Sequence, residues 1–354
     1  MRIEISIQDI INIFAEDLKD AMTLTPLDNS QQTTIRDAIG TYLDSVSIAR
    51  SANTTRTYRN GMLLFQKMLT EHKLDPQKTG IDKFPENAII WFIVFLKGYA
   101  PTSERLYLTA VTSFYEYLAA EELAQINLPR IRLLIRQRAR RPGQRLPQFP
   151  TDAIEKVLEY VSQLNKKTGD DELVHLRNLR DRSFLLTLAD TGLRVHEACN
   201  LRRGDLDWNE GRAIVIGKGN REAVVRFSRR SQQAIKEYLT ARAALDGLSG
   251  RPLTALPLFA RHDKGAGKKV QPITTATGRN IVIERVTEAI GPEAKGTITP
   301  HSFRHYFVTR VLKTSGNLKL AQELARHRNI QVTQRYAHLS DDELDHGYWD
   351  VFEE

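Results

Sequence analysis

The sequence has little of what disulfide-bonded, metal-binding or membrane proteins need. Cys199 is the one cysteine among 354 residues, so neither an internal disulfide nor a cysteine-thiolate zinc cluster can form. No run of about 18 apolar residues is present, which argues against a transmembrane helix. The first residues, MRIEISIQD, include acids where a signal peptide needs a basic start and an apolar stretch. We therefore expect a cytoplasmic protein.

Acidic residues are missing from one internal stretch, although the chain contains 43 of them. None lies between Glu122 and Asp152, where arginine is abundant. Seven arginines stand there: Arg130, Arg132, Arg136, Arg138, Arg140, Arg141 and Arg145. The prolines near the end of the stretch prevent a continuous helix. Residues 129–150 are therefore predicted to be a basic, extended linker between two domains that contacts a DNA backbone.

The net charge of +8 is unevenly distributed along the chain. Residues 1–30 carry six acids and two bases, and the segment from Asp341 to the end carries seven acids and neither Lys nor Arg. The acidic ends flank a body that is more basic than the total indicates, which favours a polyanionic partner. Residues 6–20 are amphipathic, and we expect a short helix that packs on its own domain or contacts another protomer.

Residues 34–128 have helical apolar periods and are expected to form a first domain. Four helices are predicted there, at about 34–49, 54–72, 86–98 and 102–123. Their aromatic residues, among them Phe92 and Phe114, should form the core. Arg56, Arg59 and Arg105 lie near helix starts, where side-chain charge and free backbone N–H groups bind phosphate together, although solvated surface is an equally ordinary place for them.

Residues 151–338 are expected to form a second domain, mainly α with a small antiparallel β-sheet. Two short β-runs around a Gly-Lys-Gly-Asn turn predict a hairpin with Lys218 near its tip. Three short helices should follow later, with Thr299 and Asn317 as N-caps of the first two and Asn329 beginning the third. Residues 339–354 are expected to form a tail helix, because Ser340-Asp341-Asp342-Glu343 is a capping-box pattern and the apolar Leu344, Tyr348, Trp349 and Phe352 follow it.

Four blocks of this sequence resemble the tyrosine site-specific recombinases of the phage-integrase type. They are TGLRVHE at 191–197, GKGNR at 217–221, HSFRH at 301–305, and RH followed after eight residues by Tyr336. The order of the blocks and the last interval match the family pattern, and the resemblance spans about residues 34–340. The family usually has Leu-Gly before the last histidine, whereas Ala325-Arg326 stands here. Arg326 could add a phosphate or backbone contact. His305 is expected to be a supporting or surface residue.

The resemblance implies a helical, SAM-like core-binding domain, an α+β catalytic domain and a set of catalytic residues. Tyr336 would be the nucleophile, and Arg194 and Arg304 would clamp the phosphate. His301 and His327 would transfer protons and donate hydrogen bonds.

The general acid and one supporting acid are less sharply defined by the pattern. Lys218 would protonate the leaving oxygen, although Arg221 is close on the same hairpin and Lys268 or Lys269 could compete with it. Glu197 would be a supporting acid, or simply an i,i+3 partner that orients the neighbouring arginine.

These residue types suit phosphoryl chemistry independently of the family. Guanidinium groups bind the non-bridging oxygens of a phosphodiester in fixed planar geometry and keep their charge. A phenol with a pKa of about 10 needs nearby cations or a base to attack at neutral pH. A covalent 3′-phosphotyrosine conserves the bond energy, so we expect neither cofactor, metal nor ATP.

The resemblance also implies partners. These are double-stranded DNA and further copies of the chain, two on each DNA site and four in the synapse, with exchange of the C-terminal tail. Accessory DNA-binding proteins and association with the nucleoid are further expectations. Integration, excision, inversion and dimer resolution are all outcomes of this chemistry. The alternatives are a type IB topoisomerase-like enzyme and a DNA-binding regulator that has lost catalysis.

Overall fold

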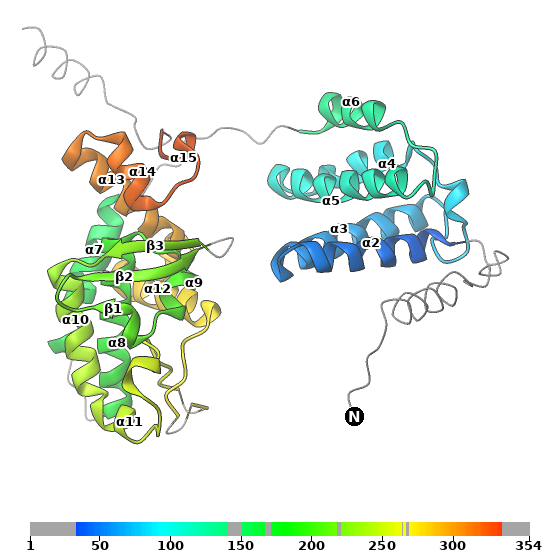
Figure 1. Ribbon diagram of the computed structural model, residues 1–354. Coiled ribbons are helices and arrows are strands. Elements are labelled where there is room, and N and C mark those ends of the chain that lie inside the picture. Colours follow the sequence, from blue (N-terminus) through cyan, green and yellow to red (C-terminus); the bar gives the residue numbers. More distant parts are fainter. Residues whose placement is uncertain are drawn as a thin grey trace, which may run out of the picture. The chain divides into compact units, whose positions relative to one another are not determined.

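The computed structural model describes residues 33–140, 151–166, 171–217, 221–263, 265–266 and 269–334. The chain divides into two compact units, with the boundary after Arg145 (Figure 1). The N-terminal amphipathic helix and the C-terminal tail helix that the sequence predicts lie outside the described residues. None of the described helices has the length and apolarity needed to cross a membrane.

Unit 1 is a bundle of helices around an aromatic core (Figure 1). Phe65 stands at its centre and contacts Phe92 edge-on, with ring centroids 5.2 Å apart. Phe114 and Tyr115 are also fully buried, so the predicted aromatic core is confirmed. The helices are α2 (Ile35–Ala49), α3 (Ala52–Glu71), α4 (Ala88–Phe95), α5 (Pro101–Ala120) and α6 (Leu128–Arg138), with 3₁₀ turns at Ile81–Lys83 and Leu96–Gly98.

The first four of these helices confirm the prediction within a few residues. Thr34 caps α2 and exchanges hydrogen bonds with Asp37. α3 begins earlier than expected, because Ser51 supplies the N-cap and accepts a hydrogen bond from the backbone N of Thr54.

Helix α6 corrects the expectation of an extended linker. Residues 128–138 are helical, with Asn127 as N-cap and Pro129 in the first turn, where a missing N–H costs nothing. Ile131 is fully buried, and Leu134 and Ile135 pack beside it on the core of unit 1. The prolines that argued against a helix all follow Arg138. The prediction of extended chain is therefore wrong for this part of residues 129–150, and α6 belongs to unit 1.

Unit 2 is mainly helical with a small antiparallel sheet, as the sequence predicts (Figure 1). The sheet has the order β1-β2-β3, and Gly217 pairs with Arg221 at the turn end of the β2–β3 hairpin. Its strands are β1 (Leu206–Asp207), β2 (Arg212–Gly217) and β3 (Arg221–Arg226). Its helices are α7 (Thr151–Ser162), α8 (Glu172–Thr191), α9 (Val195–Asn200), α10 (Arg229–Ala241), α11 (Ala243–Gly247), α12 (Thr275–Ile290), α13 (Pro300–Ser315), α14 (Leu318–Ala325) and α15 (Ile330–Gln334). Short 3₁₀ turns lie at Leu164–Lys166, Arg203–Asp205, Leu253–Ala255 and Pro292–Ala294.

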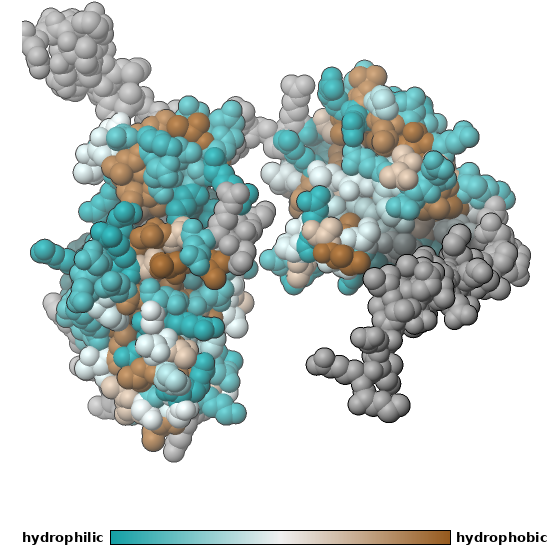
Figure 2. Space-filling model, viewed as in Figure 1, coloured by the Kyte–Doolittle hydropathy of each residue, from teal (hydrophilic) through white to brown (hydrophobic). Residues whose placement is uncertain are grey.

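The two faces of the sheet differ in burial. Ala213, Val215 and Val225 point into the core. Ile214 and Ile216 point outward and are 57% and 62% exposed, forming an apolar patch over β2 and β3 (Figure 2). This alternation is what a half-buried sheet requires.

The end of α8 fixes the turn that leads to α9. Gly192 adopts a φ of 60°, a left-handed conformation that favours glycine. A Cβ at this position would lie 2.4 Å from Cδ1 of Phe307 on α13. Glycine is therefore required here both by the backbone and by the close approach of α13, and Arg194 follows two residues later.

Candidate active site

Arg194 is the N-cap of α9, and one carboxylate holds both its backbone and its side chain. Its backbone N donates to Oε2 of Glu197 at 2.9 Å, and its Nη1 donates to Oε1 of the same group at 2.9 Å. The side chain of Glu197 is fully buried, whereas that of Arg194 is 40% exposed. Part of the guanidinium therefore remains open to a ligand. Of the two predicted roles for Glu197, the contacts support orientation of Arg194.

A second arginine binds Glu197 from another element. Nη2 of Arg326, the residue after α14, lies 3.0 Å from Oε2 of Glu197. Burial alone would raise the pKa of Glu197, but Arg326 and the hydrogen bonds from Arg194 outweigh it and hold the pKa below its ordinary value. The buried carboxylate is thus ionised at neutral pH.

Arg304 connects two segments from within α13. Its Nη1 donates to the carbonyl of Gly192, and its Nη2 donates to the carbonyl of Ala325. The residue is only 3% exposed. Thr299 caps α13 and Pro300 occupies its first turn, which confirms the predicted start and places His301 one turn before Arg304. Arg304 thereby joins the α8–α9 turn to the end of α14.

Three imidazoles share this region with the arginines. The rings of His301 and His305 meet edge-on, with centroids 4.0 Å apart. Nδ1 of His327 lies 2.9 Å from Oγ1 of the buried Thr333 on α15. Asn317 caps α14 and Asn329 stands at the start of α15, so the predicted helix starts are confirmed.

The cations and the surrounding protein lower the pKa of every one of these imidazoles. Burial, followed by Arg304 and Arg194, lowers the pKa of His327 to about 4. Burial and His301 lower the pKa of His305 to about 3. Although the His301 ring is partly exposed, its pKa is lowered too, first by partial desolvation and then by Arg304. The histidines are therefore neutral at pH 7 and can accept protons or donate single hydrogen bonds.

The described structure gathers six of the predicted residues into one cluster: Arg194, Glu197, His301, Arg304, Arg326 and His327. His305, which the sequence suggested as supporting or surface, packs within it. Its spacing of four residues from His301 on one helix was the available signal. Lys218, Tyr336 and Lys268 lie outside the described residues. Arg221 is described only as part of β3, and Lys269 lies exposed in a loop.

Unit 1 carries a basic groove of about 780 Å³ between α5 and α6. Arg105 and Arg136 line it together with Arg50 and Tyr58. Arg140 lines the groove as well, so three arginines predicted to bind DNA meet at one surface. Arg50 was missed by sequence reasoning, because it stands as a single base at the end of α2 without a charged run around it.

Most of the other predicted DNA-contacting arginines fall into three groups. Arg56, Arg59 and Arg138 are exposed. Arg130 and Arg132 form ion pairs with acids of unit 1, at 3.2 Å from Glu86 and 2.7 Å from Glu116. Arg141 and Arg145 lie outside the described residues.

Arg140 is bonded more extensively than its neighbours. Its Nε donates to Oε2 of Glu104 at 2.6 Å, and its Nη2 donates to the carbonyl oxygens of Leu96 and Tyr99. Lys97 donates to the same buried carboxylate at 3.1 Å. These contacts tie the residues after α6 to α5, so most of the hydrogen-bonding capacity of Arg140 is used within unit 1.

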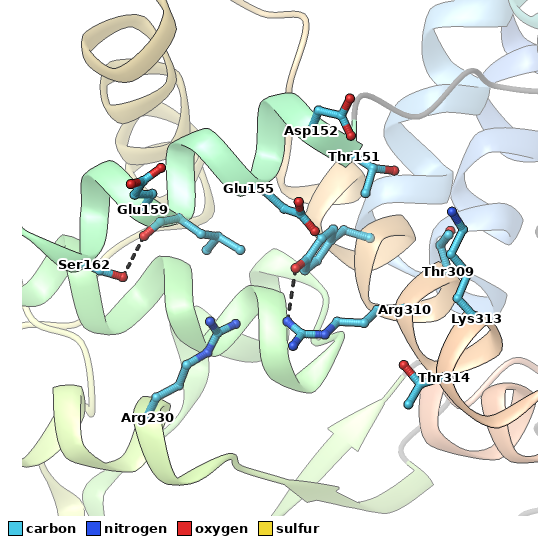
Figure 3. A pocket seen from close by; sticks show the side chains of 12 residues that line it. Thr151, Asp152, Glu155, Glu159, Ser162, Arg230, Thr309, Arg310, Lys313 and Thr314 are labelled. Carbon is cyan, nitrogen blue, oxygen red and sulfur yellow. Dashed lines mark hydrogen bonds between the residues drawn. The ribbon is translucent and has the colours of Figure 1, made fainter.

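A separate open hollow of about 640 Å³ lies on unit 2 among α7, α10 and α13 (Figure 3). Glu155 and Glu159 of α7 line it together with Arg310 of α13 and Arg230 of α10. Nη1 of Arg310 donates to the hydroxyl of Tyr306 at 3.1 Å. None of the predicted catalytic residues that the structure describes lines this hollow.

Comparison with known proteins places this chain in a family. The chain is 29% identical over 300 residues to tyrosine recombinase XerC of Treponema denticola, covering 83% of this chain and 91% of that protein. It is 30% identical over 274 residues to XerC of Bacillus pumilus, covering 76% and 82%. It is also 29% identical over 306 residues to tyrosine recombinase XerD of Mycobacterium tuberculosis H37Rv, covering 83% and 90%.

Solved structures share the fold. A post-cleavage complex of the XerH site-specific recombinase with its palindromic difH substrate matches with a TM-score of 0.65 and 17% identity, covering 92% of this chain and 98% of that one. The Tn1549 transposon integrase, in complex with a circular intermediate DNA, matches with a TM-score of 0.61 and 17% identity, covering 90% and 99%. The family model described as "Phage integrase family" matches residues 154–343, more than half of the chain. The chain therefore belongs to the phage integrase family.

Proposed function

We propose that the protein is a site-specific DNA recombinase that cleaves and rejoins strands through a covalent 3′-phosphotyrosine. The observation that carries the proposal is the convergence of Arg194, Arg304 and neutral histidines from three separate segments. Such a cluster offers fixed positive charge and single hydrogen bonds but no carboxylate free to ligate a metal, which suits a phosphodiester. The relatives named as tyrosine recombinases support the same reading.

The reaction exchanges one phosphoester bond for another. Oη of Tyr336 attacks the scissile phosphorus, the bond to the 5′-oxygen breaks, and the phenolic proton passes to a neutral imidazole. Lys218 gives a proton to the departing 5′-oxygen. A 5′-hydroxyl from another strand then attacks the phosphotyrosine and releases the tyrosine. Each step conserves the number of phosphoester bonds, so the chemistry needs no energy source.

The arginines and histidines act on the charge that develops during attack. The exposed part of Arg194 and the positive charge of Arg304 stabilise the charge on the non-bridging oxygens in the transition state. His301 and His327 enter the reaction uncharged, so either can accept the proton that the phenol loses. A permanently charged imidazolium in the same place could only donate.

Binding of double-stranded DNA would involve both units. In unit 1 the groove with Arg50, Arg105 and Arg136 offers several guanidiniums for backbone phosphates, and the exposed Arg56, Arg59 and Arg138 add further charge. Arg141 and Arg145 continue the basic stretch. Arg130, Arg132 and Arg140 would contribute less, because acids of unit 1 already bind them.

Assembly on DNA would involve several copies of the chain. We place two copies on each site and four in the synapse, with the apolar residues Leu344, Tyr348, Trp349 and Phe352 of the tail contacting a neighbouring copy. Light scattering of the complex, with and without residues 339–354, tests this arrangement. Loss of the tail should leave two-copy or single-copy complexes. Association with the nucleoid and with accessory DNA-binding proteins would follow from the same role.

The experiment that tests the proposed function has two stages. DNA bound by the Tyr336→Phe protein in its own host is mapped first, which supplies the site. A nicked suicide substrate with that site is then incubated with the wild-type protein and with Tyr336→Phe. A covalent adduct with wild type alone is expected. Tight binding without an adduct would identify a regulator, and relaxation of any supercoiled plasmid would identify a topoisomerase.

A further inference from the structure

Arg326 occupies a backbone position that disfavours an arginine. It follows α14 as the C-cap, with φ 58° and ψ 43°, in the left-handed region. Among the described non-glycine residues only Lys73, Glu122 and Arg326 have a positive φ. Glycine is the usual residue in such a cap. A side chain that persists there despite the backbone strain needs a compensating contact.

The side chain of Arg326 makes that contact inside the active site. It is 12% exposed, and its Nη2 lies 3.0 Å from Oε2 of Glu197, whose side chain is fully buried. This oxygen is the one that accepts the backbone N–H of Arg194, while Oε1 accepts from the Arg194 guanidinium. One carboxylate therefore joins two arginines that are 132 residues apart in the sequence.

The Arg326–Glu197 ion pair and the hydrogen bonds of Arg304 connect the same two segments of the chain. Arg304 ties the carbonyl of Gly192 to that of Ala325. The ion pair of Arg326 ties the residue after Ala325 to α9, which begins three residues after Gly192. Two links thus connect the segment carrying Arg194 to the segment carrying His327. The link through Arg304 uses neutral carbonyls, whereas the link through Arg326 uses a buried charge pair.

We propose that Arg326 is a positioning residue, which fixes the carboxylate of Glu197 and through it aims Arg194 at the scissile phosphate. The proposal rests on the recombinase function above. Arg326 also restores a net positive charge to the Arg194–Glu197 pair. Glu197 alone would cancel the charge of Arg194, whereas with Arg326 the trio keeps one net positive charge for an incoming phosphate. The carboxylate also stays ionised, because both guanidiniums oppose the effect of burial.

The first test separates binding of DNA from cleavage of DNA. Arg326→Gly keeps the left-handed cap and removes the guanidinium. Affinity for the mapped site should stay within about twofold of wild type, while single-turnover adduct formation should fall by roughly tenfold or more, as for loss of positioning in a phosphoryl site. Arg326→Lys retains a charge that can reach Glu197 and should recover part of the rate. Lys73→Gly is the matched control, because it also removes a cation at a positive φ and should cleave like wild type.

A double-mutant cycle tests whether Arg326 acts through Glu197. Arg326→Gly, Glu197→Gln and the double variant are compared in adduct formation. If the route is correct, the double variant should be about as slow as the slower single variant, rather than slower by the product of both effects. The same cycle in urea unfolding should give a coupling of about tenfold in the unfolding equilibrium constant, and this readout needs no activity.

Three results would overturn the proposal. Wild-type cleavage by Arg326→Gly would show that Arg194 needs no help. A loss of affinity as large as the loss of rate, with multiplicative effects in the cycle, would make Arg326 a DNA contact instead. If the urea cycle gives no coupling, Arg326 and Glu197 do not stabilise each other, and their ion pair cannot position Arg194. Absence of any adduct with the wild-type protein would refute the recombinase function, while the urea cycle would still decide whether Arg326 and Glu197 interact.

Discussion

Gly192 and Gly316 form a natural pair for testing how the active site is anchored. Both end a helix with φ near 60°, but a Cβ on Gly192 would lie 2.4 Å from Phe307, whereas nothing lies within 4 Å of one on Gly316. Gly316→Ala should cost about 1 kcal/mol of unfolding free energy, from backbone strain alone. Gly192→Ala should cost about 3 kcal/mol, because overpacking adds to the strain.

Cleavage should separate the two variants further. Arg304 binds the carbonyl of Gly192, so displacement of that turn also misplaces the guanidinium. Urea unfolding and single-turnover cleavage measure the two effects. We expect Gly316→Ala to cleave like wild type. Equal losses of stability in both variants would contradict the proposed contact with Phe307.

Histidines whose pKa is lowered in the folded protein should make stability depend on pH. The pKa of His327 is lowered to about 4, and those of His262 and His305 to about 3, with burial as the first cause of each. Near pH 5 the unfolded chain therefore binds protons that the folded chain does not, so stability increases with pH in this range. The free energy of unfolding should fall as the pH is lowered from about 6.5 towards 4.

Urea titrations at pH 7, 6 and 5 check this sign. His305→Gln removes one of the three groups and should show a shallower decline than wild type. A wild-type stability that is unchanged between pH 7 and pH 5 would mean that these imidazoles are protonated within the folded protein.

Sequence reasoning found the charged residues of the site and the Arg194–Glu197 pair, but not the contacts between segments far apart in the sequence. The resemblance to the family pattern supplied Arg194, Arg304, His301 and His327. That Glu197 binds two arginines could not be predicted, because the second partner comes from a loop 129 residues away, and its approach depends on how α14 ends. The non-glycine cap at Arg326 was visible as a departure from the family, and its meaning required the backbone conformation.

At the scale of elements, α6 shows how a charge pattern can hide an amphipathic one. Ile131, Leu134 and Ile135 stand at i, i+3 and i+4, the spacing of a helix that buries one face. The arginines between them dominate the composition, and the prolines downstream favoured an extended chain. The segment forms a helix because burying its apolar face on α4 and α5 is more favourable in free energy than leaving that face exposed to water. The four earlier helices have no such conflict, and the sequence predicted them well.

Substitutions at two residues of α6 test how much the packing of this helix stabilises unit 1. Ile131 is fully buried and Leu133 is 47% exposed. Ile131→Ala should cost about 2–4 kcal/mol of the unfolding free energy of unit 1, whereas Leu133→Ala should cost less than about 1 kcal/mol. Chemical unfolding of the full chain carrying Trp208→Phe and Trp349→Phe, followed through the remaining Trp91 fluorescence of unit 1, gives both values. Equal effects of the two variants would mean that α6 does not pack on unit 1.

At the scale of the whole molecule, charge varies along the chain, and many of the basic residues are buried or ion-paired. The net charge of +8 is made by a basic body between two acidic ends, and many of the bases in the body are not available to a partner. Arg242 and Arg285 are buried in ion pairs with Asp246 and Asp181, and Arg140 is committed to Glu104. Counting basic residues therefore overstates the surface that DNA can meet. The exposed arginines and the groove of unit 1 are the part that remains.

The difference between exposed and ion-paired arginines predicts which of them control the salt dependence of DNA binding. Each phosphate contact releases condensed counterions, so the slope of log K against log salt should be less steep by about 1 for each contact removed. Replacing Arg105 and Arg136 by Ala removes two guanidiniums from the groove and should reduce the slope by about 2. Replacing Arg130 and Arg132, which are already ion-paired, should change the slope by less than about 1 in total.

Lys78→Ala, an exposed lysine outside the groove, serves as the charge control. Filter binding or fluorescence anisotropy between about 50 and 200 mM salt provides the slopes. Slopes reduced by about 2 in both double variants would mean that the ion pairs of unit 1 open on DNA and that all four arginines reach phosphate.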